Sequence, residues 1–488
     1  MAQRHHDLAV FEEIEHEEGK VFFFQQPFHR IKSKLRPWYI LISFAVFLGI
    51  VIAPTPAGLT VEGQRAIAIF VLCILFWVAN AIPLVITSLL AIVLLPLLGV
   101  MSSPDSFALF GNQAVFFILG AFILASAVMQ SGLSTRIALK LLSLFGKDNR
   151  RLLAGVLLLP ALLSFVMAAH AVAAMMYPIV VEMITALKLK KGHRYGAALM
   201  LALAWGAIIG GIATFLGGAR AVLAVGILEE TAGVTIGFLP WMLSALPAVF
   251  VAMIVAMGLL LWIIRKDKTD VHIAVESLQQ KVDTMDALSY EEKGVSVLMI
   301  STIIAWVFFG QELGLATIAL TAVAVAFIFK LMSWKQVEAD VNWGIIFMYG
   351  GAIALGFALS ESGAAAWIAD VFISNWIASA STLLLMLMVM SKVFTEGMSN
   401  TAVIALLMPI GVALAAQYGI DPKIVTLAIT LPAGLAFILP ISTPATAIAI
   451  SSGYVTTRDT MWSGIVLHVI TAIILFASAV LFWPAIVS

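Results

Sequence analysis

The sequence predicts an all-α, polytopic membrane protein built from two related halves, and three observations support this fold class. The chain has 488 residues, of which 62% are hydrophobic and 11% are charged, whereas a typical soluble domain has about 25% charged residues. Apolar stretches long enough to cross a bilayer, about 20 residues each, recur along the chain. Similar sequences also recur in the two halves at one constant offset.

Residues 1–37 form a polar and charged N-terminal arm. The arm lacks the apolar core of a signal peptide, so we expect it to stay uncleaved and cytoplasmic. Within it, residues 9–36 mix acidic, aromatic and basic side chains. That composition fits either an amphipathic helix at the membrane interface or a solvated arm.

Hydropathy predicts about 11 transmembrane spans after the arm. They lie at residues 38–54, 64–80, 82–99, 113–132, 195–215, 238–264, 295–310, 313–332, 343–360, 423–440 and 462–485. Four apolar stretches are too interrupted by polar residues, glycine or proline to be simple spans, at 152–180, 205–228, 382–416 and 432–455. These four segments are predicted to be broken within the membrane.

Basic residues predict the orientation of the chain. They gather at 30–36, 136–151, 188–194 and 265–268, whereas 55–63 and 100–112 carry none. Loops rich in Lys and Arg usually face the cytoplasm. We therefore expect a multi-pass protein of the inner or plasma membrane with its N-terminus in the cytoplasm.

A polar interval at 266–294 divides the chain into a first membrane half, 38–265, and a second, 295–488. We expect this interval to be a cytoplasmic linker. The sequence from Gly120 resembles that from Gly351, and the same offset in numbering relates Pro178 to Pro409 without a gap. One repeat therefore covers approximately 64–265 and its partner the second half, a plan typical of transporters.

The second half has two polar interruptions in apolar surroundings. "KVFTEGMSNTAVIALLMPI" contains Ser399, Asn400 and Thr401, and "LAFILPISTPATAIAISSG" contains Thr443 and Pro444. Unwound backbone at membrane depth is tolerated only inside protein or beside a water-filled cavity. Its carbonyls and hydroxyls suit a cation such as Na⁺, and the helix N-terminus that follows suits an anion. Two such breaks in one half predict a binding site near the membrane midplane.

These segments resemble the divalent anion/sodium symporter (DASS) family over roughly residues 38–485. The likeness rests on "NAIPLVITSLLAIVLLPLLGVMS", "SNTAVIALLMP" and "STPATAI". It implies two inverted repeats, each with a re-entrant hairpin tipped by Ser-Asn-Thr and a helix broken at Thr-Pro. It also implies an elevator-type mechanism and a homodimer in the lipid bilayer.

The resemblance assigns site residues in the second half. The Na⁺ ligands would be Thr395, Met398, Ser399 and Asn400, with carbonyls from 434–443. Substrate contacts would come from Ser399, Asn400, Thr401, Thr443 and Pro444. Na⁺ is then the expected coupling ion and a small anion the expected substrate.

The first half departs from the family pattern. The repeat offset places Ala168, Ala169 and His170 where Ser-Asn-Thr is expected, while Ser164 keeps an upstream hydroxyl. This is a degenerate first cation site.

The broken helix of the first half also departs from that pattern, because its Thr-Pro segment is replaced by Gly217-Gly218-Ala219-Arg220. We hypothesise that Arg220, with His170, supplies a fixed positive charge to the anion where relatives bind Na⁺. Gly218 is a further predicted substrate contact. The alternatives are that Arg220 pairs with Glu229 or Glu230, and that His170 donates to a backbone carbonyl.

Three other polar residues of the second half receive structural interpretations. Lys392 and Glu396 are four positions apart, so they are able to pair on one helical face and to hold the hairpin tip at the membrane surface. Glu396 is also placed to tune the adjacent site. His468, in the last span, is interpreted as a hydrogen-bonded packing residue.

The function predicted from these features is secondary active transport of a small divalent anion, dicarboxylate-like or sulfate, coupled to Na⁺ through one intact site. The alternative is a Na⁺-independent or proton-coupled exchanger in which Arg220 and His170 replace one cation. An anion channel is a more distant alternative, because no filter-like polar periodicity is present.

Catalytic and P-loop motifs are absent, so neither an enzyme nor an ATP-driven pump is predicted. No nucleic-acid partner is expected, and Cys73, the one cysteine, excludes an internal disulfide.

Overall fold

The structure is a computed structural model that describes residues 36–79, 81–146, 148–373, 377, 379–440 and 442–487. The predicted N-terminal arm, 1–37, therefore lies almost entirely outside the described residues. All regular secondary structure in the described part of the chain is helical. Within the same residues, nine helices are long and apolar enough to cross a membrane. The prediction of an all-α polytopic membrane protein is confirmed.

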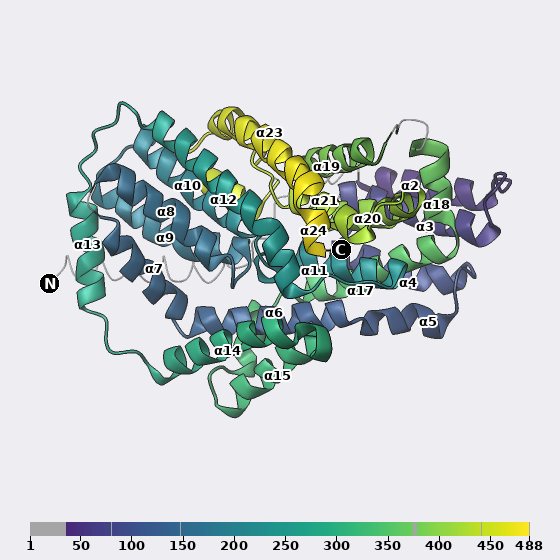
Figure 1. Ribbon diagram of the computed structural model, residues 1–488, viewed down its shortest axis with the longest axis horizontal. Helices are drawn as coiled ribbons and strands as arrows, with labels where there is room; N and C mark the ends of the chain where they lie inside the picture. Colours follow the sequence, from purple (N-terminus) through teal and green to yellow (C-terminus); the bar gives the residue numbers. More distant parts are fainter. Residues whose placement is uncertain are drawn as a thin grey trace.

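Helices of the first half lie at both ends of the elongated molecule in Figure 1. They are α2 (Arg36–Ile52), α3 (Val61–Ala79), α4 (Leu84–Leu97), α5 (Ser103–Ala108), η1 (Leu109–Gly111), α6 (Gln113–Gln130), α7 (Leu133–Leu144), α8 (Asn149–Leu163), α9 (Ala169–Ala186), α10 (Arg194–Gly210), η2 (Phe215–Gly217), α11 (Ala219–Ala232) and α12 (Phe238–Ile263).

The second half repeats this order of elements after the linker helix α13 (His272–Asp283). Its helices are α14 (Tyr290–Leu313), α15 (Leu315–Ile328), α16 (Trp334–Asp340), α17 (Trp343–Glu361), α18 (Ala364–Ile368), η3 (Ala369–Ile373), α19 (Ala380–Gly397), α20 (Asn400–Gln417), α21 (Pro422–Ala433), α22 (Pro444–Ser451), α23 (Thr457–Leu481) and α24 (Trp483–Val487).

The repeat offset, which relates Gly120 to Gly351, also holds for backbone geometry. Left-handed residues occur in pairs at that spacing: Gly99 with Lys330, Gly132 with Gly363, and Lys188 with Gly419. Such residues end helices or begin new ones. Helices α9 and α20 are related by the same offset at both of their ends. The two halves therefore turn at equivalent positions, while their inverted relation and the full count of spans stay predictions.

Equivalent glycines mark the contacts between the halves. A Cβ on Gly120 of α6 would lie 2.8 Å from the Cβ of Ala319 in α15, and one on Gly351 of α17 would lie 2.4 Å from the carbonyl oxygen of Ser88 in α4. The contacted residues, Ser88 and Ala319, are related by the repeat offset as well. Each half thus packs the same helix surface against the other half, and α12 likewise packs against α23.

Three predicted boundaries are wrong. The spans predicted at 195–215 and 423–440 end early, at Gly210 and Ala433, because the residues that follow are also apolar. The interruptions themselves lie inside the segments predicted to be broken, 205–228 and 432–455. The predicted linker, 266–294, already contains the start of α14. Ser289 and Glu292 form a capping box that starts this helix before its apolar run.

The linker helix α13 stands at one end of the molecule in Figure 1, beside α7 and α9. Lys281 of α13 forms an ion pair with Glu182 of α9, at 2.5 Å between Nζ and Oε2. The linker is therefore held against the first half rather than extended away from it.

Candidate functional site

Two helical hairpins carry the segments singled out in the sequence. Helices α8 and α9 meet at residues 164–168, and α19 and α20 meet at Met398 and Ser399. Ser399 caps α20 by accepting a hydrogen bond from the backbone nitrogen of Ala402, at 3.2 Å. Ala168 caps α9 without a side-chain hydrogen bond. The first hairpin, which lacks the Ser-Asn-Thr triplet, therefore has a longer turn and no polar side-chain cap on its second helix.

Each hairpin packs against a helix that is interrupted within the apolar region. Helix α10 ends at Gly210 and α11 starts at Ala219, while α21 ends at Ala433 and α22 starts at Pro444. Thr443 caps α22, accepting from the backbone nitrogen of Thr446 at 3.2 Å. We call residues 211–218 the first break and residues 434–443 the second break.

An oxygen cluster links the second hairpin to the second break. The Thr395 hydroxyl lies 2.6 Å from Asn400 Oδ1 and 2.8 Å from the carbonyl oxygen of Ala433. The Ser399 and Thr401 hydroxyls are 3.4 Å apart at the start of α20. Neutral hydroxyl, amide and carbonyl oxygens are hard ligands of the kind that Na⁺ accepts. The residues predicted as the second-half cation site, Met398 at the tip included, thus gather at one place.

Helices α11 and α20 both start beside α17, next to its neighbouring residues Tyr349 and Met348. The Thr401 hydroxyl is 3.9 Å from Met348 Sδ, and the neighbouring Tyr349 hydroxyl donates to the carbonyl of Ala219. Two helix N-termini, one from each half, therefore begin next to each other. Free backbone N–H groups at such ends favour an anion.

Arg220 lies between the two breaks. Its side chain is buried, and Nη2 donates to the carbonyl of Gly211 at 2.9 Å. A Cβ on Gly218 would lie 2.1 Å from Nη1, and one on Gly434 would lie 2.2 Å from Nη2. The guanidinium thus fits only because both positions are glycine. Gly434 directly follows Ala433, so Arg220 borders the oxygen cluster of the second half.

The proposed ion pairs of Arg220 are not found. No ion pair of Arg220 occurs within the described residues, and Glu230 instead accepts a hydrogen bond from Asn112 Nδ2 at 2.7 Å. Arg220 is therefore a buried cation whose one hydrogen bond among the described residues goes to the carbonyl of Gly211. The carboxyl ends of α10 and α21 supply the negative ends of two helix dipoles beside it.

The first hairpin tip is packed too closely to reproduce the oxygen cluster. A Cβ on Gly211 would lie 2.9 Å from the Cβ of Ala169, and one on Gly217 would lie 2.6 Å from the carbonyl oxygen of Ser164. The Ser164 hydroxyl is buried and makes no hydrogen bond to any described residue. The tip is also tied to the first break by Thr214, whose hydroxyl donates to the carbonyl of Phe165 at 2.7 Å. Thr214 was missed in the sequence, although it is the one hydroxyl in the first break.

His170 lies at the start of α9, where its side chain keeps accessible surface although protein atoms surround it. It makes no hydrogen bond or ion pair among the described residues, so the expected bond to a backbone carbonyl is not found. Helix α9 packs against α22, which begins at Thr443 and Pro444. The structure gives no contact between His170 and Arg220. Of the predicted substrate contacts, Arg220 lies against Gly218, and Ser399 and Thr401 lie together at the start of α20.

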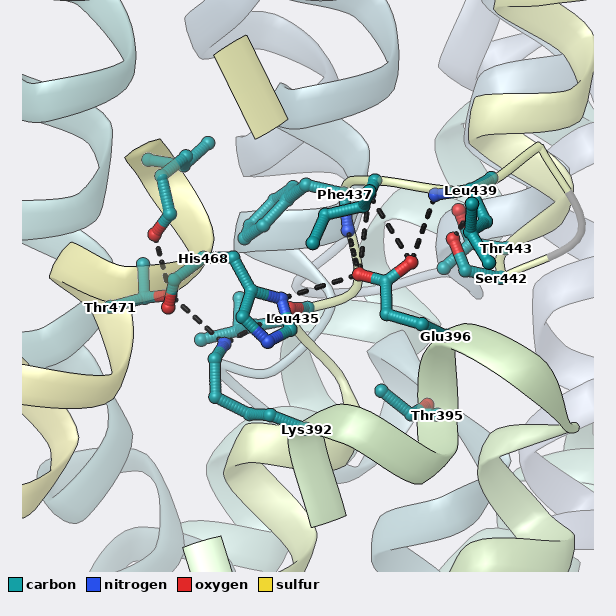
Figure 2. A network of polar contacts seen from close by, with 12 residues as sticks. Lys392, Thr395, Glu396, Leu435, Phe437, Leu439, Ser442, Thr443, His468 and Thr471 are labelled. Carbon is teal, nitrogen blue, oxygen red and sulfur yellow. Dashed lines mark hydrogen bonds and ion pairs between the residues drawn. The ribbon is translucent and has the colours of Figure 1, made fainter. Parts of the chain in front are cut away.

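Figure 2 shows that Lys392 and Glu396 point from α19 into the protein. Both side chains are buried, so the prediction that they hold the tip at the membrane surface is wrong. The predicted pairing of the two is not found either, because each reaches the second break or α23 instead. His468 Nδ1 lies 3.2 Å from Glu396 Oε1. The sequence signal for this cluster is a Lys, a Glu and a His in otherwise largely apolar helices.

A cavity of about 320 Å³ lies between α8 and α12, and Phe165 of the first hairpin turn is among its lining residues. Its walls are apolar, and Leu162, Phe250 and Ile254 line it. It has no polar group to orient an anion, so it is not the predicted site.

Comparison with known proteins identifies the family. The model for the sodium:sulfate symporter transmembrane region matches residues 34–488. The sodium-dependent dicarboxylate transporter SdcS of Staphylococcus saprophyticus is 27% identical over 449 residues, covering 86% of each chain. SdcS of Staphylococcus aureus is 27% identical over 452 residues with the same coverage.

Two solved transporters share the fold at low sequence identity. MtrF of Neisseria gonorrhoeae aligns with a TM-score of 0.55 and 13% identity, over 92% of this chain and 94% of its own. YdaH of Alcanivorax borkumensis aligns with a TM-score of 0.52 and 14% identity, over 92% of this chain and 98% of its own. The family is one of membrane transporters, not of enzymes. The family model matches nearly the whole chain, and the motifs, the hairpins and the breaks agree with it. The chain therefore belongs to the sodium:sulfate symporter family, the divalent anion/sodium symporters.

Proposed function

We propose that the protein is a secondary active transporter of a small divalent anion, dicarboxylate-like or sulfate, coupled to Na⁺ through the oxygen cluster of the second half. The observation that carries this proposal is the buried Arg220 guanidinium between the two breaks. A buried cation without a carboxylate partner is costly unless a negative ligand or carbonyl dipoles compensate it.

Arg220 stands where a cation is expected in the first half. It contacts the carbonyl of Gly211, at the carboxyl end of α10, and such ends coordinate cations in transporters built from broken helices. A tethered charge attracts the anion but is not itself transported. We therefore propose that fewer Na⁺ ions accompany each anion than in a relative with two intact sites.

The second half supplies the remaining contacts. Thr395, Ser399, Asn400 and the Met398 backbone would hold Na⁺, in keeping with the distances among the oxygen atoms of Thr395, Asn400 and Ala433. Thr401, Thr443 and the N-termini of α20 and α22 would hold the anion. Support for this arrangement comes from the adjacency of Arg220 and Gly434.

A second candidate, a Na⁺-independent or proton-coupled exchanger, is favoured by one observation. His170 is exposed and has no hydrogen-bond partner among the described residues, so it is free to meet an anion.

We also propose, from the family resemblance, a homodimer with elevator-type alternating access and a cytoplasmic N-terminus.

The test uses purified protein, with succinate, citrate, sulfate and phosphate screened by thermal shift with and without Na⁺. A ligand that binds the native state raises the melting temperature. Arg220→Ala should abolish the shift from the best anion, and Arg220→Lys should retain part of it because the charge stays while the planar fork is lost. Counterflow of labelled succinate or sulfate in proteoliposomes separates a carrier from a channel. Unchanged anion binding in Arg220→Ala would refute the proposal.

A further inference from the structure

The apolar cavity between α8 and α12 is a groove on the surface of the first half, and we call it the α8–α12 groove. Its floor is formed by buried side chains, Leu157 and Ala161 of α8 with Val249 and Met253 of α12. Its rims are formed by exposed side chains, Leu158 and Leu162 of α8 with Phe250 and Ile254 of α12. Lipid chains are as apolar as these leucines, so in a protein that crosses a bilayer they are the chemistry that fits this surface.

The groove has the length of one leaflet of a bilayer. It extends from Ala154 to Phe165 along the first hairpin and from Leu246 to Met257 along α12. A helix rises about 1.5 Å per residue, so the groove is about 16 Å long. The hydrocarbon core of a bilayer is about 30 Å thick, and each leaflet contributes half of it. The groove therefore matches an acyl chain that enters from one leaflet.

The start of α8 and the end of α12 lie together. Asn149, the first residue of α8, donates through Nδ2 to the carbonyl of Asp267 at 3.2 Å, just beyond the end of α12. The two helices therefore run in opposite directions along the groove. Ala154 of α8 and Met257 of α12 consequently lie at the same end of it.

Arginine follows the apolar stripe at that end on both helices. On α8, Arg150 precedes Ala154 by four residues, and on α12 the series Met257 and Leu261 reaches Arg265 in steps of four, just beyond the last turn. Residues four apart share one face of a helix. The side chains of Arg150 and Arg265 are exposed, and neither forms an ion pair with a described residue.

Trp262 indicates that Arg265 lies at the level of the lipid headgroups. The Arg265 guanidinium is 5.0 Å from the centroid of the Trp262 ring, and the Trp262 side chain is 62% exposed. Exposed tryptophans gather where the hydrocarbon meets the headgroups. The acidic residues nearest in sequence are already engaged, because Asp148 caps α8 and Asp267 accepts from Thr269. The two arginines are therefore available to an anion at the membrane surface.

We propose that the α8–α12 groove binds one anionic phospholipid, with an acyl chain along the groove and the phosphate held by Arg150 and Arg265. Arginine suits phosphate because its planar fork donates paired hydrogen bonds to the oxygens. Basic residues beside transmembrane helices attract anionic headgroups in the same way. The lipid site is separate from the proposed anion site, and the inference does not depend on the transported substrate.

The bound chain would also contact the first hairpin. Phe165 lines the end of the groove away from the arginines, and its carbonyl accepts from the Thr214 hydroxyl at 2.7 Å. The chain end thus adjoins a residue that is bonded to the first break. Because a ligand that binds the native state stabilises it, the anionic lipid should raise the melting temperature of the protein.

The experiment measures lipid binding to the purified full-length chain in a non-ionic detergent. Native mass spectrometry counts bound palmitoyl-oleoyl phosphatidylglycerol and, in a parallel titration, phosphatidylcholine with the same chains. The first phosphatidylglycerol should bind more tightly, by about fivefold for each arginine that contacts it, and should raise the melting temperature. Glycerol 3-phosphate, which has a phosphate but no acyl chain, should do neither.

The headgroup contact is tested by Arg150→Gln combined with Arg265→Gln. This double variant should lose about 25-fold in affinity for phosphatidylglycerol, at about fivefold per arginine, and keep its affinity for phosphatidylcholine. Lys293→Gln combined with Lys335→Gln is the matched control, because it removes the same charge from exposed positions of α14 and α16. The control should bind both lipids as the wild type does.

The chain contact is tested by Ala154→Phe, which places a ring in the groove. Ala154 is partly exposed and lines the groove, so the variant should lose affinity for both lipids alike. Ala305→Phe adds the same bulk at a partly exposed position of α14 and should leave both affinities unchanged.

Four results overturn the inference. They are equal affinities of the wild type for the two lipids, equal phosphatidylglycerol binding by the two double variants, unchanged lipid binding in folded Ala154→Phe, and stabilisation by glycerol 3-phosphate that equals stabilisation by phosphatidylglycerol. The last result would indicate a site for soluble phosphate instead. The arginine substitutions alter exposed side chains only, so they test the inference even if Ala154→Phe does not fold.

Discussion

At the scale of single residues, the site depends on where small side chains leave room for polar ones. Arg220 reaches Gly211 because Gly218 and Gly434 have no Cβ to obstruct its guanidinium. Thr395 bridges Asn400 and Ala433 because the hairpin tip approaches the end of α21 closely. Both arrangements lead to predictions about single substitutions.

Gly434→Ala should displace the guanidinium of Arg220. The added Cβ would lie 2.2 Å from Nη2, and the end of the Arg220 side chain moves more readily than the backbone. Anion affinity should fall at least about tenfold, equivalent to about 1.4 kcal/mol, as measured by thermal shift with succinate and sulfate. Gly397→Ala is the control, because nothing lies within 4 Å of a Cβ there. Equal anion affinities in the two variants would contradict the placement of Arg220 at the site.

Thr395→Val should weaken Na⁺ coupling while leaving the fold intact. The substitution removes a hydroxyl that lies 2.6 Å from Asn400 Oδ1 and 2.8 Å from the Ala433 carbonyl. Loss of one such polar contact costs about 1–2 kcal/mol, so the Na⁺ concentration for half-maximal uptake should rise about tenfold. Thr426→Val is the control, since its hydroxyl bonds only within its own helix, to Pro422. A Na⁺ dependence unchanged by Thr395→Val would remove this residue from the cation site.

At the scale of elements, the two halves place turns, hairpins and breaks at matching positions. The same left-handed positions and the same close glycine contacts recur at the repeat offset. The first break is further fixed by aromatic packing, in which Phe215 contacts Trp241 and Phe117 with ring centroids 4.8 and 6.1 Å apart. These rings hold the first break against α6 and α12.

Gly351→Ala should destabilise the contact between α17 and α4. Its Cβ would lie 2.4 Å from the backbone carbonyl oxygen of Ser88, and overpacking of this kind costs about 1–3 kcal/mol. The melting temperature in detergent, followed by tryptophan fluorescence, should fall. Gly258→Ala should instead raise it slightly, because nothing lies within 4 Å and alanine favours a helix by up to about 1 kcal/mol over glycine. A melting temperature for Gly351→Ala at or above that of the wild type would show that the helices separate easily there.

At the scale of the whole molecule, helices of the two halves pack against each other. This packing brings the first and the second break together at Arg220. Helix α11 of the first half packs against α20 and α21 of the second, and α22 of the second packs against α9 and α10 of the first. Each half thus supplies one side of the proposed anion site. Neither half alone would place Arg220 beside Gly434.

Orientation in the membrane gives a prediction at this scale. Cys73 is buried, so single cysteines introduced at exposed positions can be labelled over a low background. Ala57→Cys should react with a membrane-impermeant maleimide on intact cells, whereas Lys268→Cys should react only after permeabilisation. The opposite pattern would place the linker outside the cytoplasm.

The sequence by itself determined the membrane class and the family, and it indicated a repeat offset that the backbone geometry shares. These follow from local information: apolar length, basic loops, and polar triplets that interrupt a helix. The sequence located the broken segments 205–228 and 432–455 but not the exact ends of α10 and α21 within them, because the residues beyond each break are as apolar as a span. It also misplaced Lys392 and Glu396.

Only the tertiary structure decided what those buried charges contact. Lys392 and Glu396 reach backbone groups of the second break and a side chain of α23, which are 41 to 79 residues away along the chain. Arg220 lies against Gly434 of the other half. Hydropathy and motif spacing report neighbours along one helix, whereas the partner of a buried charge is set by which helices pack together. That physical difference is why the family was readable in the sequence and the Lys392, Glu396 and His468 cluster was not.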